Sequence, residues 1–215
     1  YPVEARDNGG AAPGDVVAAD IVRGRRGQHA RITAIIGPIE NPGTFSLIAL
    51  KSRGIPIEFN PEALAQAEHA KPAPLELGAK GLRRADLRDI PLVTIDGADA
   101  RDFDDAVWAA ADEDSKNPGG WRLIVAIADV SWYVRPGDAL DQSARERGTS
   151  VYFPDRVTPM LPEALSNDLC SLRPDEDRAC IAAHIWIDKN GAIVRSTFER
   201  ALMRSAARLT YEQVQ

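Results

Sequence analysis

The sequence predicts a mixed α+β fold, in which a small antiparallel β-barrel precedes a larger domain of strands and helices. Three observations lead to this prediction. Short strands joined by glycine-containing turns occupy the first part, a proline-rich segment (71–74) interrupts the chain, and longer apolar strands alternate with amphipathic helices after residue 84. A chain of 215 residues can bury a substantial core. We place the domains at residues 1–70 and 84–215, joined by a linker at 71–83.

The first domain is predicted from three apolar segments at residues 15–22, 29–36 and 45–50. A basic, glycine-containing turn at 23–27 joins the first two. Short strands with this spacing suit a small barrel of the kind that binds single-stranded nucleic acid, although a purely structural β-module fits the pattern nearly as well. A helix over 61–70 should follow, because Asn60 is a good N-cap and Pro61 suits the first helical position.

The second domain begins with strands at 91–96 and 106–110. Residues 121–130 are almost continuously apolar, which predicts a strand buried on both faces. An amphipathic helix over 138–147 should end at Gly148, and Pro162 should open a second short helix.

A hairpin is expected near the end of this domain. Strands at 180–188 and 192–199 flank Asn190-Gly191, the strongest local hairpin signal in the sequence. A further helix should begin near residue 210. The chain starts without Met and ends where that helix begins, so we expect a piece of a longer protein.

Composition suggests an ordinary globular protein, with 44% hydrophobic and 27% charged residues. No apolar run approaches the roughly 18 residues of a membrane span, and no signal-peptide pattern opens the chain. We therefore expect a cytoplasmic monomer without an obligatory protein partner. Cys170 and Cys180 fit no zinc motif and are predicted to be buried, reduced thiols.

The net charge of −6 argues at first against a nucleic-acid partner. Residues 1–83 carry 10 basic and 9 acidic residues and residues 84–215 carry 16 and 23, so the excess of negative charge (−7) lies in the second part. Bound metal ions in that part would cancel some of it.

Five aspartates fall within ten residues directly after an apolar strand, and Arg101 is the only cation among them. They are Asp96, Asp99, Asp102, Asp104 and Asp105. Carboxylates this close raise one another's pKa unless cations neutralise them. All-oxygen ligands suit Mg²⁺ or Mn²⁺, so we predict a divalent-metal site. A solvated acidic loop and a calcium-stabilised structural loop are the alternatives.

Local geometry supports convergence of several of these carboxylates. Asp102 and Asp104 should share one face of an extended segment, whereas Asp105 should point away unless the chain kinks. Asp96 can meet them by folding back across the turn at Gly97. Such a group can hold two divalent ions, which would clamp both the attacking and the leaving oxygen of a phosphodiester cleavage.

Several ordered blocks resemble the ribonuclease II/ribonuclease R family of exoribonucleases. The aspartate run at 92–106 is similar to the family signature, and further similar blocks follow in family order at 125–131, 147–154, 159–172 and 207–211. The Arg-Gly-Thr-Ser-Val-Tyr-Phe-Pro block at 147–154 is closer to ribonuclease R than to ribonuclease II. Weaker similarity over 45–70 matches the second cold-shock (OB) domain of these enzymes, so the second domain would be the N-terminal portion of an RNB catalytic domain.

The resemblance implies roles for individual residues. Asp96, Asp102 and Asp105 would bind magnesium, with two ions in the complete site and manganese possible. Asp104 would be the aspartate on which hydrolysis depends most, whereas Asp99 would bind no metal. Tyr152 would stack against the terminal base of the RNA, with an ordinary core tyrosine as the alternative.

The resemblance also implies an overall activity. The longer protein would be a magnesium-dependent 3′→5′ exoribonuclease that acts on single-stranded RNA and releases nucleoside 5′-monophosphates. This piece alone would be inactive, because the rest of the catalytic domain would be missing. The alternative is a non-catalytic RNA-binding or interaction module.

Overall fold

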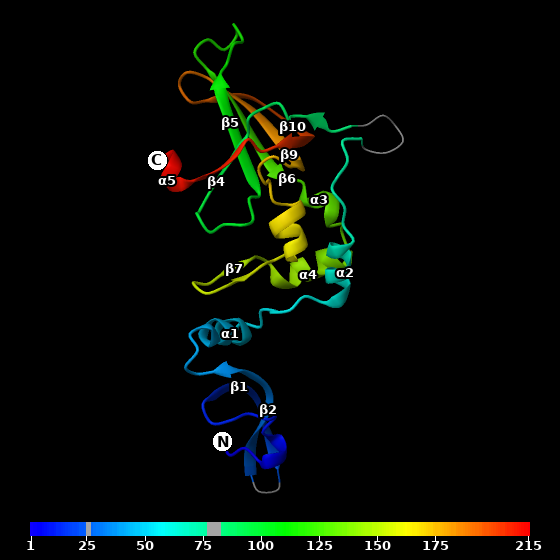
Figure 1. Cartoon of the computed structure of the whole chain (residues 1–215), viewed down its shortest axis with the longest axis vertical. Helices are drawn as coiled ribbons and strands as arrows, with labels where there is room; N and C mark the ends of the chain where they lie inside the picture. Colours follow the sequence, from blue (N-terminus) through cyan, green and yellow to red (C-terminus); the bar gives the residue numbers. More distant parts are fainter. Residues whose placement is uncertain (25–26, 77–82) are drawn as a thin grey trace. The chain divides into compact units, whose positions relative to one another are not determined.

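The computed structural model describes residues 1–24, 27–76 and 83–215 (Figure 1). Arg25 and Arg26 of the predicted basic turn, and residues 77–82 of the predicted linker, lie outside the described residues. The chain divides into two units, the first formed by Tyr1–Glu58 with Glu146–Met160 and the second by Phe59–Arg145 with Leu161–Gln215. The predicted mixed fold is confirmed, with helices and strands in both units.

The first unit is built on an antiparallel hairpin of β1 (Asp15–Gly24) and β2 (Gly27–Pro38), at the places where two strands are predicted. The 3₁₀ helix η1 (Ala5–Asp7) precedes the hairpin. In the later segment of this unit, Glu146–Met160, β7 (Val151–Tyr152) pairs with β8 (Val157–Thr158). The third predicted strand, 45–50, is wrong because these residues belong to helix α1 (Gly43–Ser52).

Local contacts explain why α1 forms. The Asn41 side chain accepts a hydrogen bond from Gly43 N, at 3.0 Å, and starts the first turn. Thr44 Oγ1 donates to the Pro38 carbonyl oxygen at 2.8 Å, and Leu50 is fully buried. Short apolar runs do not by themselves distinguish helix from strand, so these contacts decide the outcome.

The second unit contains a seven-stranded sheet in the order β11-β4-β5-β6-β9-β10-β3. The strands are β3 (Ala85–Asp86), β4 (Val93–Asp96), β5 (Asp105–Ala111), β6 (Trp121–Ala128), β9 (Asp177–Ile187), β10 (Ile193–Arg204) and β11 (Ala207–Thr210). The β9–β10 hairpin turns at Gly191, whose φ of 88° is left-handed, as the Asn-Gly pair predicts. Helix α5 (Tyr211–Val214) begins directly after β11, as predicted.

The helices of this unit share the core with one face of the sheet. They are α2 (Pro61–Glu68), α3 (Val130–Tyr133), α4 (Ala139–Arg147) and the π-helical turn η2 (Leu165–Leu169) (Figure 1). Asn60 caps α2 by accepting from Ala63 N at 2.7 Å, and Gly148 ends α4 with a left-handed φ of 75°. Both helix boundaries are as predicted.

Two expectations differ from this packing. Strand β6 buries Ile124, Ala126 and Ala128 but exposes Trp121 and Ile127, so it is buried on one face and the prediction of two buried faces is wrong. Helix α2 belongs to the second unit, whereas the predicted boundary at residue 70 placed it with the first. Its residues Ala63 and Ala67 lie in the core of the second unit.

Candidate metal and phosphate site

The aspartate loop, defined here as residues 96–105, joins two strands of the large sheet. Asp96 is the last residue of β4, where it is in register with Thr210 of the parallel strand β11, and Asp105 is the first residue of β5. Asp96 is partly buried, and its Oδ2 atom is buried without a hydrogen-bond partner in the described part of the chain. A buried carboxylate oxygen left this way is available to a bound cation.

Arg208 of β11 holds the first half of the aspartate loop. Its Nη2 atom donates to the carbonyl oxygens of Gly97, at 3.3 Å, and Ala98, at 2.5 Å. Its guanidinium carbon lies 4.8 Å from the centre of the Phe103 ring. One arginine, more than a hundred residues away in sequence, therefore connects the turn after Asp96 to the middle of the aspartate loop.

Ser171 and Leu172 hold the second half. Ser171 Oγ accepts from Phe103 N at 3.2 Å and donates to the Arg101 carbonyl oxygen at 3.0 Å, and Leu172 N donates to the Phe103 carbonyl oxygen at 2.7 Å. The Phe103 side chain is buried, whereas Asp104 is exposed and Asp102 partly exposed. This arrangement agrees with the alternation that places Asp102 and Asp104 on one face.

The carboxylates of the aspartate loop perturb one another. Burial raises the pKa of Asp96, and the charges of Asp105, Asp104 and Asp102 raise it further, against the opposing charge of Arg208. Burial also raises the pKa of Asp104, to which Asp105 and Asp102 add. The structure thus brings Asp96, Asp102, Asp104 and Asp105 close enough for the charges of the others to raise the pKa of Asp96, and for those of Asp102 and Asp105 to raise the pKa of Asp104.

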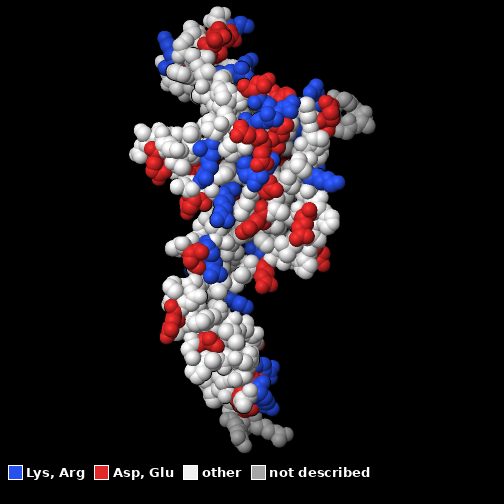
Figure 2. All heavy atoms as spheres, in the orientation of Figure 1, with Lys and Arg blue, Asp and Glu red and all other residues white. Residues whose placement is uncertain are grey.

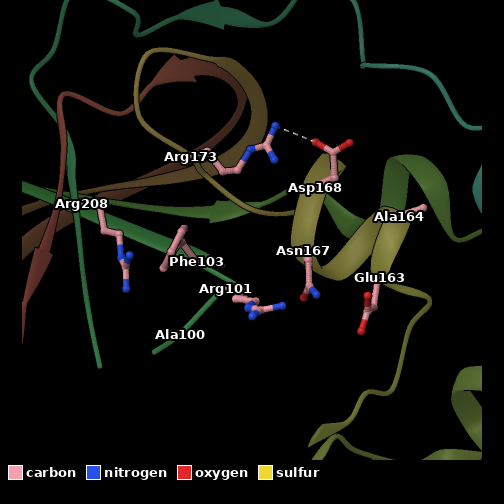
Figure 3. Close-up of a pocket in the computed structure, with 9 residues that line it drawn as sticks. All are labelled: Ala100, Arg101, Phe103, Glu163, Ala164, Asn167, Asp168, Arg173 and Arg208. Atoms are coloured by element: carbon pink, nitrogen blue, oxygen red, sulfur yellow. Dashed lines mark ion pairs between the residues drawn. The ribbon is translucent and has the colours of Figure 1, made fainter. Parts of the chain in front are cut away.

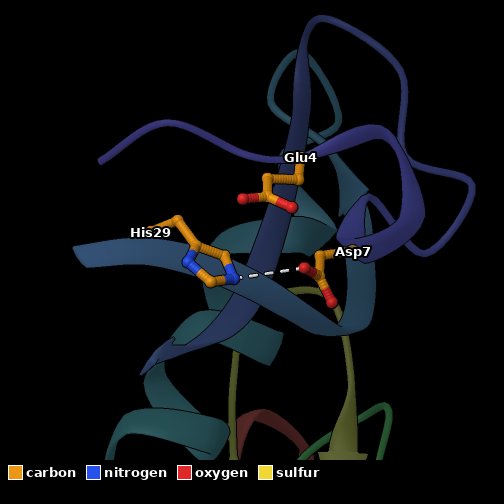
Figure 4. Close-up of side chains that lie close together, drawn as sticks. All are labelled: Glu4, Asp7 and His29. Atoms are coloured by element: carbon orange, nitrogen blue, oxygen red, sulfur yellow. Dashed lines mark ion pairs between the residues drawn. The ribbon is translucent and has the colours of Figure 1, made fainter. Parts of the chain in front are cut away.

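This donor set fits a hard divalent cation, which prefers carboxylate oxygens. The aspartates are not drawn into a tight cage. In residues 1–24, 27–76 and 83–215, the only group of three or more possible ligands whose atoms all lie within 4.8 Å of one another is Glu4, Asp7 and His29 (Figure 4). Mg²⁺ does not need a tight protein cage, because it commonly keeps waters and takes further oxygens from substrate phosphate.

The Glu4, Asp7 and His29 group has a different character. His29 Nε2 lies 3.2 Å from Asp7 Oδ2, and Asp7 also contacts Arg31 at 3.1 Å and Arg6 at 3.5 Å. Burial raises the pKa of Asp7, but Arg31, Arg6 and His29 together outweigh burial and lower it. The carboxylate is already neutralised, so this group is an ion-pair cluster of the first unit.

Tyr152 lies in β7, opposite Val157, and its side chain is 63% exposed. It is therefore not a core tyrosine. It belongs to the first unit and the aspartates to the second, so only the aspartates are brought together by a single unit.

A cavity of about 590 Å³ borders the aspartate loop (Figure 3). Its lining comprises Ala100, Arg101, Phe103, Glu163, Ala164, Asn167, Asp168, Arg173 and Arg208. Sequence reasoning assigned no role to most of these residues. The one feature of the sequence that pointed to this cavity was Arg101, the single cation among five aspartates.

Cys170 and Cys180 are free and buried, as predicted. Burial raises the pKa of both thiols to about 12, so neither forms a reactive thiolate near neutral pH. Across the described residues, no helix is long and apolar enough to span a membrane.

Comparison with known proteins places both parts of the chain. The RNB domain family matches residues 84–215, and the cold shock domain family matches residues 1–60. The chain is 47% identical over 212 residues to ribonuclease R of Vibrio parahaemolyticus and 47% identical over 208 residues to that of Escherichia coli, in each case over 95% of the chain. It spans about a quarter of the length of these relatives (24% and 25%).

Solved structures agree with this placement. Mycoplasma genitalium RNase R in complex with double-stranded RNA has a TM-score of 0.86 and 28% identity, over 99% of this chain and 37% of the other. Yeast Ssd1, described as a pseudonuclease, shares the fold, with a TM-score of 0.67 and 20% identity over 94% of this chain and 25% of its own. With the aspartate loop, the two matched domains and these ribonuclease R relatives taken together, the chain belongs to the ribonuclease II/ribonuclease R family.

Proposed function

We propose that the chain forms part of a 3′→5′ exoribonuclease that hydrolyses single-stranded RNA to nucleoside 5′-monophosphates. The observation that carries the proposal is the aspartate loop, whose backbone is held by Arg208, Ser171 and Leu172 and whose four interacting carboxylates lie within the RNB match. The relatives bear the name ribonuclease R, and one similar structure contains RNA.

Individual residues would have separate roles in metal binding, hydrolysis and base stacking. Asp96, Asp102 and Asp105 would hold two magnesium ions, or manganese, with the buried Oδ2 of Asp96 as one donor. Magnesium, when bound, supplies positive charge to phosphate oxygens and lowers the pKa of a bound water. Asp104, exposed and with a raised pKa, would be the carboxylate on which hydrolysis depends most. The exposed ring of Tyr152 would stack on the terminal base.

Surface charge on the displayed face does not form a separate basic track. Figure 2 shows Lys and Arg mingled with Asp and Glu over the described elements rather than segregated from them. On this face, RNA recognition would therefore depend on local contacts and base stacking more than on a broad positive surface.

We also propose that the protein is a cytoplasmic monomer. Light scattering would test the oligomeric state, and localisation of a tagged protein would test the compartment.

The decisive experiment uses the longer protein that carries this chain and the rest of the family's catalytic domain. Asp104→Asn should reduce mononucleotide release from labelled single-stranded RNA by at least ~100-fold, more than the loss typical of altering a residue that only supports a metal ligand. RNA binding should persist. Asp99→Asn is the matched control and should keep activity. Full turnover by the Asp104 variant would refute the proposal.

The second candidate function is a non-catalytic RNA-binding module. One observation favours it: the fold is shared with a protein described as a pseudonuclease, so the fold alone does not require hydrolysis. Titration of the 215-residue chain with magnesium and labelled single-stranded RNA separates the two functions. RNA binding without mononucleotide release by the chain, and also by the longer protein, would establish the module.

A further inference from the structure

The cavity beside the aspartate loop has two walls of different origin. Ala100, Arg101 and Phe103 come from the aspartate loop. Glu163 and Ala164 come from the helical turn that leads into η2, and Asn167 comes from η2 itself. Figure 3 shows Arg101 and Asn167 extending into the space between these walls, with Arg208 on the side of the aspartate loop. Its volume of about 590 Å³ lies within the range of small-molecule sites, about 300–1,000 Å³.

The cavity has an excess of positive charge after its internal ion pairs are counted. Arg173 pairs with Asp168 at 3.2 Å and with Glu176 at 2.8 Å, and Asp168 also pairs with Arg178 at 2.9 Å. Arg208 donates to neutral carbonyl oxygens, so its charge is not cancelled by them. Three arginines (Arg101, Arg173 and Arg208) and two carboxylates (Glu163 and Asp168) thus line the cavity, so its lining carries one net positive charge beside the acidic aspartate loop, where Arg208 also acts on Asp96.

Two hydrogen-bond donors of the lining have no acceptor. The Nε atoms of Arg173 and Arg208 are both buried, and neither has a hydrogen-bond partner in the part of the chain that the structure describes. Buried donors without partners are uncommon in folded proteins. Guanidinium groups match the oxygens of a phosphate particularly well, because several N–H donors can bind it at once.

We propose that this cavity binds a nucleoside 5′-monophosphate, with the phosphate against Arg101 and Arg208 and the nucleoside toward Asn167 and Glu163. The amide of Asn167 and the carboxylate of Glu163 offer a donor and acceptors for ribose hydroxyls or a base edge. The choice of nucleotide rests on the proposed function, whose product has this chemistry. Because Arg101 and Phe103 flank Asp102, a nucleotide bound here lies beside the aspartate loop.

Calorimetric titration of the 215-residue chain with AMP tests the proposal, in phosphate-free buffer with EDTA so that no metal ion mediates binding. AMP should bind, inorganic phosphate should bind more weakly, and adenosine should not bind measurably. Arg101→Gln should weaken AMP binding at least tenfold and Arg101→Lys less, because lysine keeps the charge but not the planar donors. Arg195→Gln, an exposed arginine of β10, is the matched control and should leave binding unchanged.

Several results would overturn the proposal: no AMP binding, equal binding of adenosine, or an Arg101→Gln variant that binds as tightly as the parent chain. Arg101 is exposed, so its substitution should not disturb folding, and circular dichroism checks this. The outcome is independent of catalysis. AMP binding with no RNA hydrolysis by the longer protein would refute the proposed function but support this site. Hydrolysis without AMP binding would support the proposed function but refute this site.

Discussion

Asp129 and the aspartate loop lie in the same unit, but their surroundings shift carboxylate pKa values in opposite directions. The Asp129 side chain is fully buried, and it accepts from Arg84 Nη1 at 2.8 Å, from Arg200 Nη1, and from Ser131 Oγ at 2.7 Å. Burial raises its pKa, but Ser131, Arg84 and Arg200 together outweigh burial and lower it.

Asp96 and Asp104 of the aspartate loop show the opposite balance. The pKa of Asp96 and of Asp104 is raised, although the charge of Arg208 opposes the rise at Asp96. Asp129 is thus held by Arg84, Arg200 and Ser131, which lower its pKa, whereas burial and neighbouring carboxylates raise the pKa of Asp96 and Asp104. This difference supports the proposed functional role of the aspartate loop and a structural role for Asp129.

The largest expected effect is the loss of stability when Asp129 is substituted. Asp129→Asn leaves Arg84 buried without its charged partner, so we expect the free energy of unfolding to fall by ~3–5 kcal/mol. Urea unfolding measures this. Asp177→Asn is the control, because Asp177 also contacts two arginines, Arg88 and Arg204, but is about a third exposed, and its loss should cost less than ~1 kcal/mol. Equal losses in the two variants would contradict the distinction.

The pH dependence of Asp129 follows from the lowered pKa. Because its folded-state pKa lies below the unfolded value of about 3.9, its contribution is complete above that pH and is lost as the pH falls through the folded-state pKa. Acid unfolding below about pH 4 should therefore be shallower in Asp129→Asn than in the parent chain. An unchanged acid limb would show that Asp129 does not carry this stabilisation.

Magnesium should act on the aspartate loop and not on Asp129. At 100 times its dissociation constant, Mg²⁺ should stabilise the chain by ~2.7 kcal/mol. The gain, measured as a shift in Tm, should be lost in Asp96→Asn and kept in Asp99→Asn. If the chain binds calcium tightly and the longer protein does not hydrolyse RNA, the results would instead favour a calcium-stabilised structural loop.

Arg208 tests whether the aspartate loop must be held in place. Arg208→Gln removes the contacts to Gly97, Ala98 and Phe103, so we expect ~1–2 kcal/mol of lost stability and a 10–100-fold loss of magnesium affinity. Arg195→Gln, which removes an exposed arginine from above the Trp186 ring, should leave magnesium affinity unchanged. An Arg208 variant that keeps full affinity would show that the aspartate loop holds its shape without this contact.

The smallest effect is a gain in stability. The raised pKa of Asp104 means that its charged form is disfavoured in the folded state, so without metal the stability should rise as the pH falls through that pKa. Asp104→Asn should remove this dependence and raise Tm at pH 7 by about 1–2 °C, since exposed substitutions change stability by about 0.5 kcal/mol. A lower Tm in the metal-free variant would contradict uncompensated charge at this position.

The sequence by itself determined the features that depend on neighbouring residues. Asn60 and Pro61 specify the start of α2, Asn190-Gly191 specifies the β9–β10 turn, and the spacing of the aspartates indicates a metal site, because capping, turn geometry and charge density are local. The site roles of the aspartates and Tyr152, and the domain boundaries, stay predictions.

Only the tertiary structure decided the rest. It buried β6 on one face, whereas the helix at residues 45–50 forms through the nearby contacts of Asn41 and Thr44, which the apolar run alone does not indicate. It also brought Arg208 and Ser171 to the aspartate loop from far along the chain and so formed the cavity at Arg101. The burial of β6, the contacts of Arg208 and Ser171, and the cavity depend on residues distant in sequence, which local patterns do not encode.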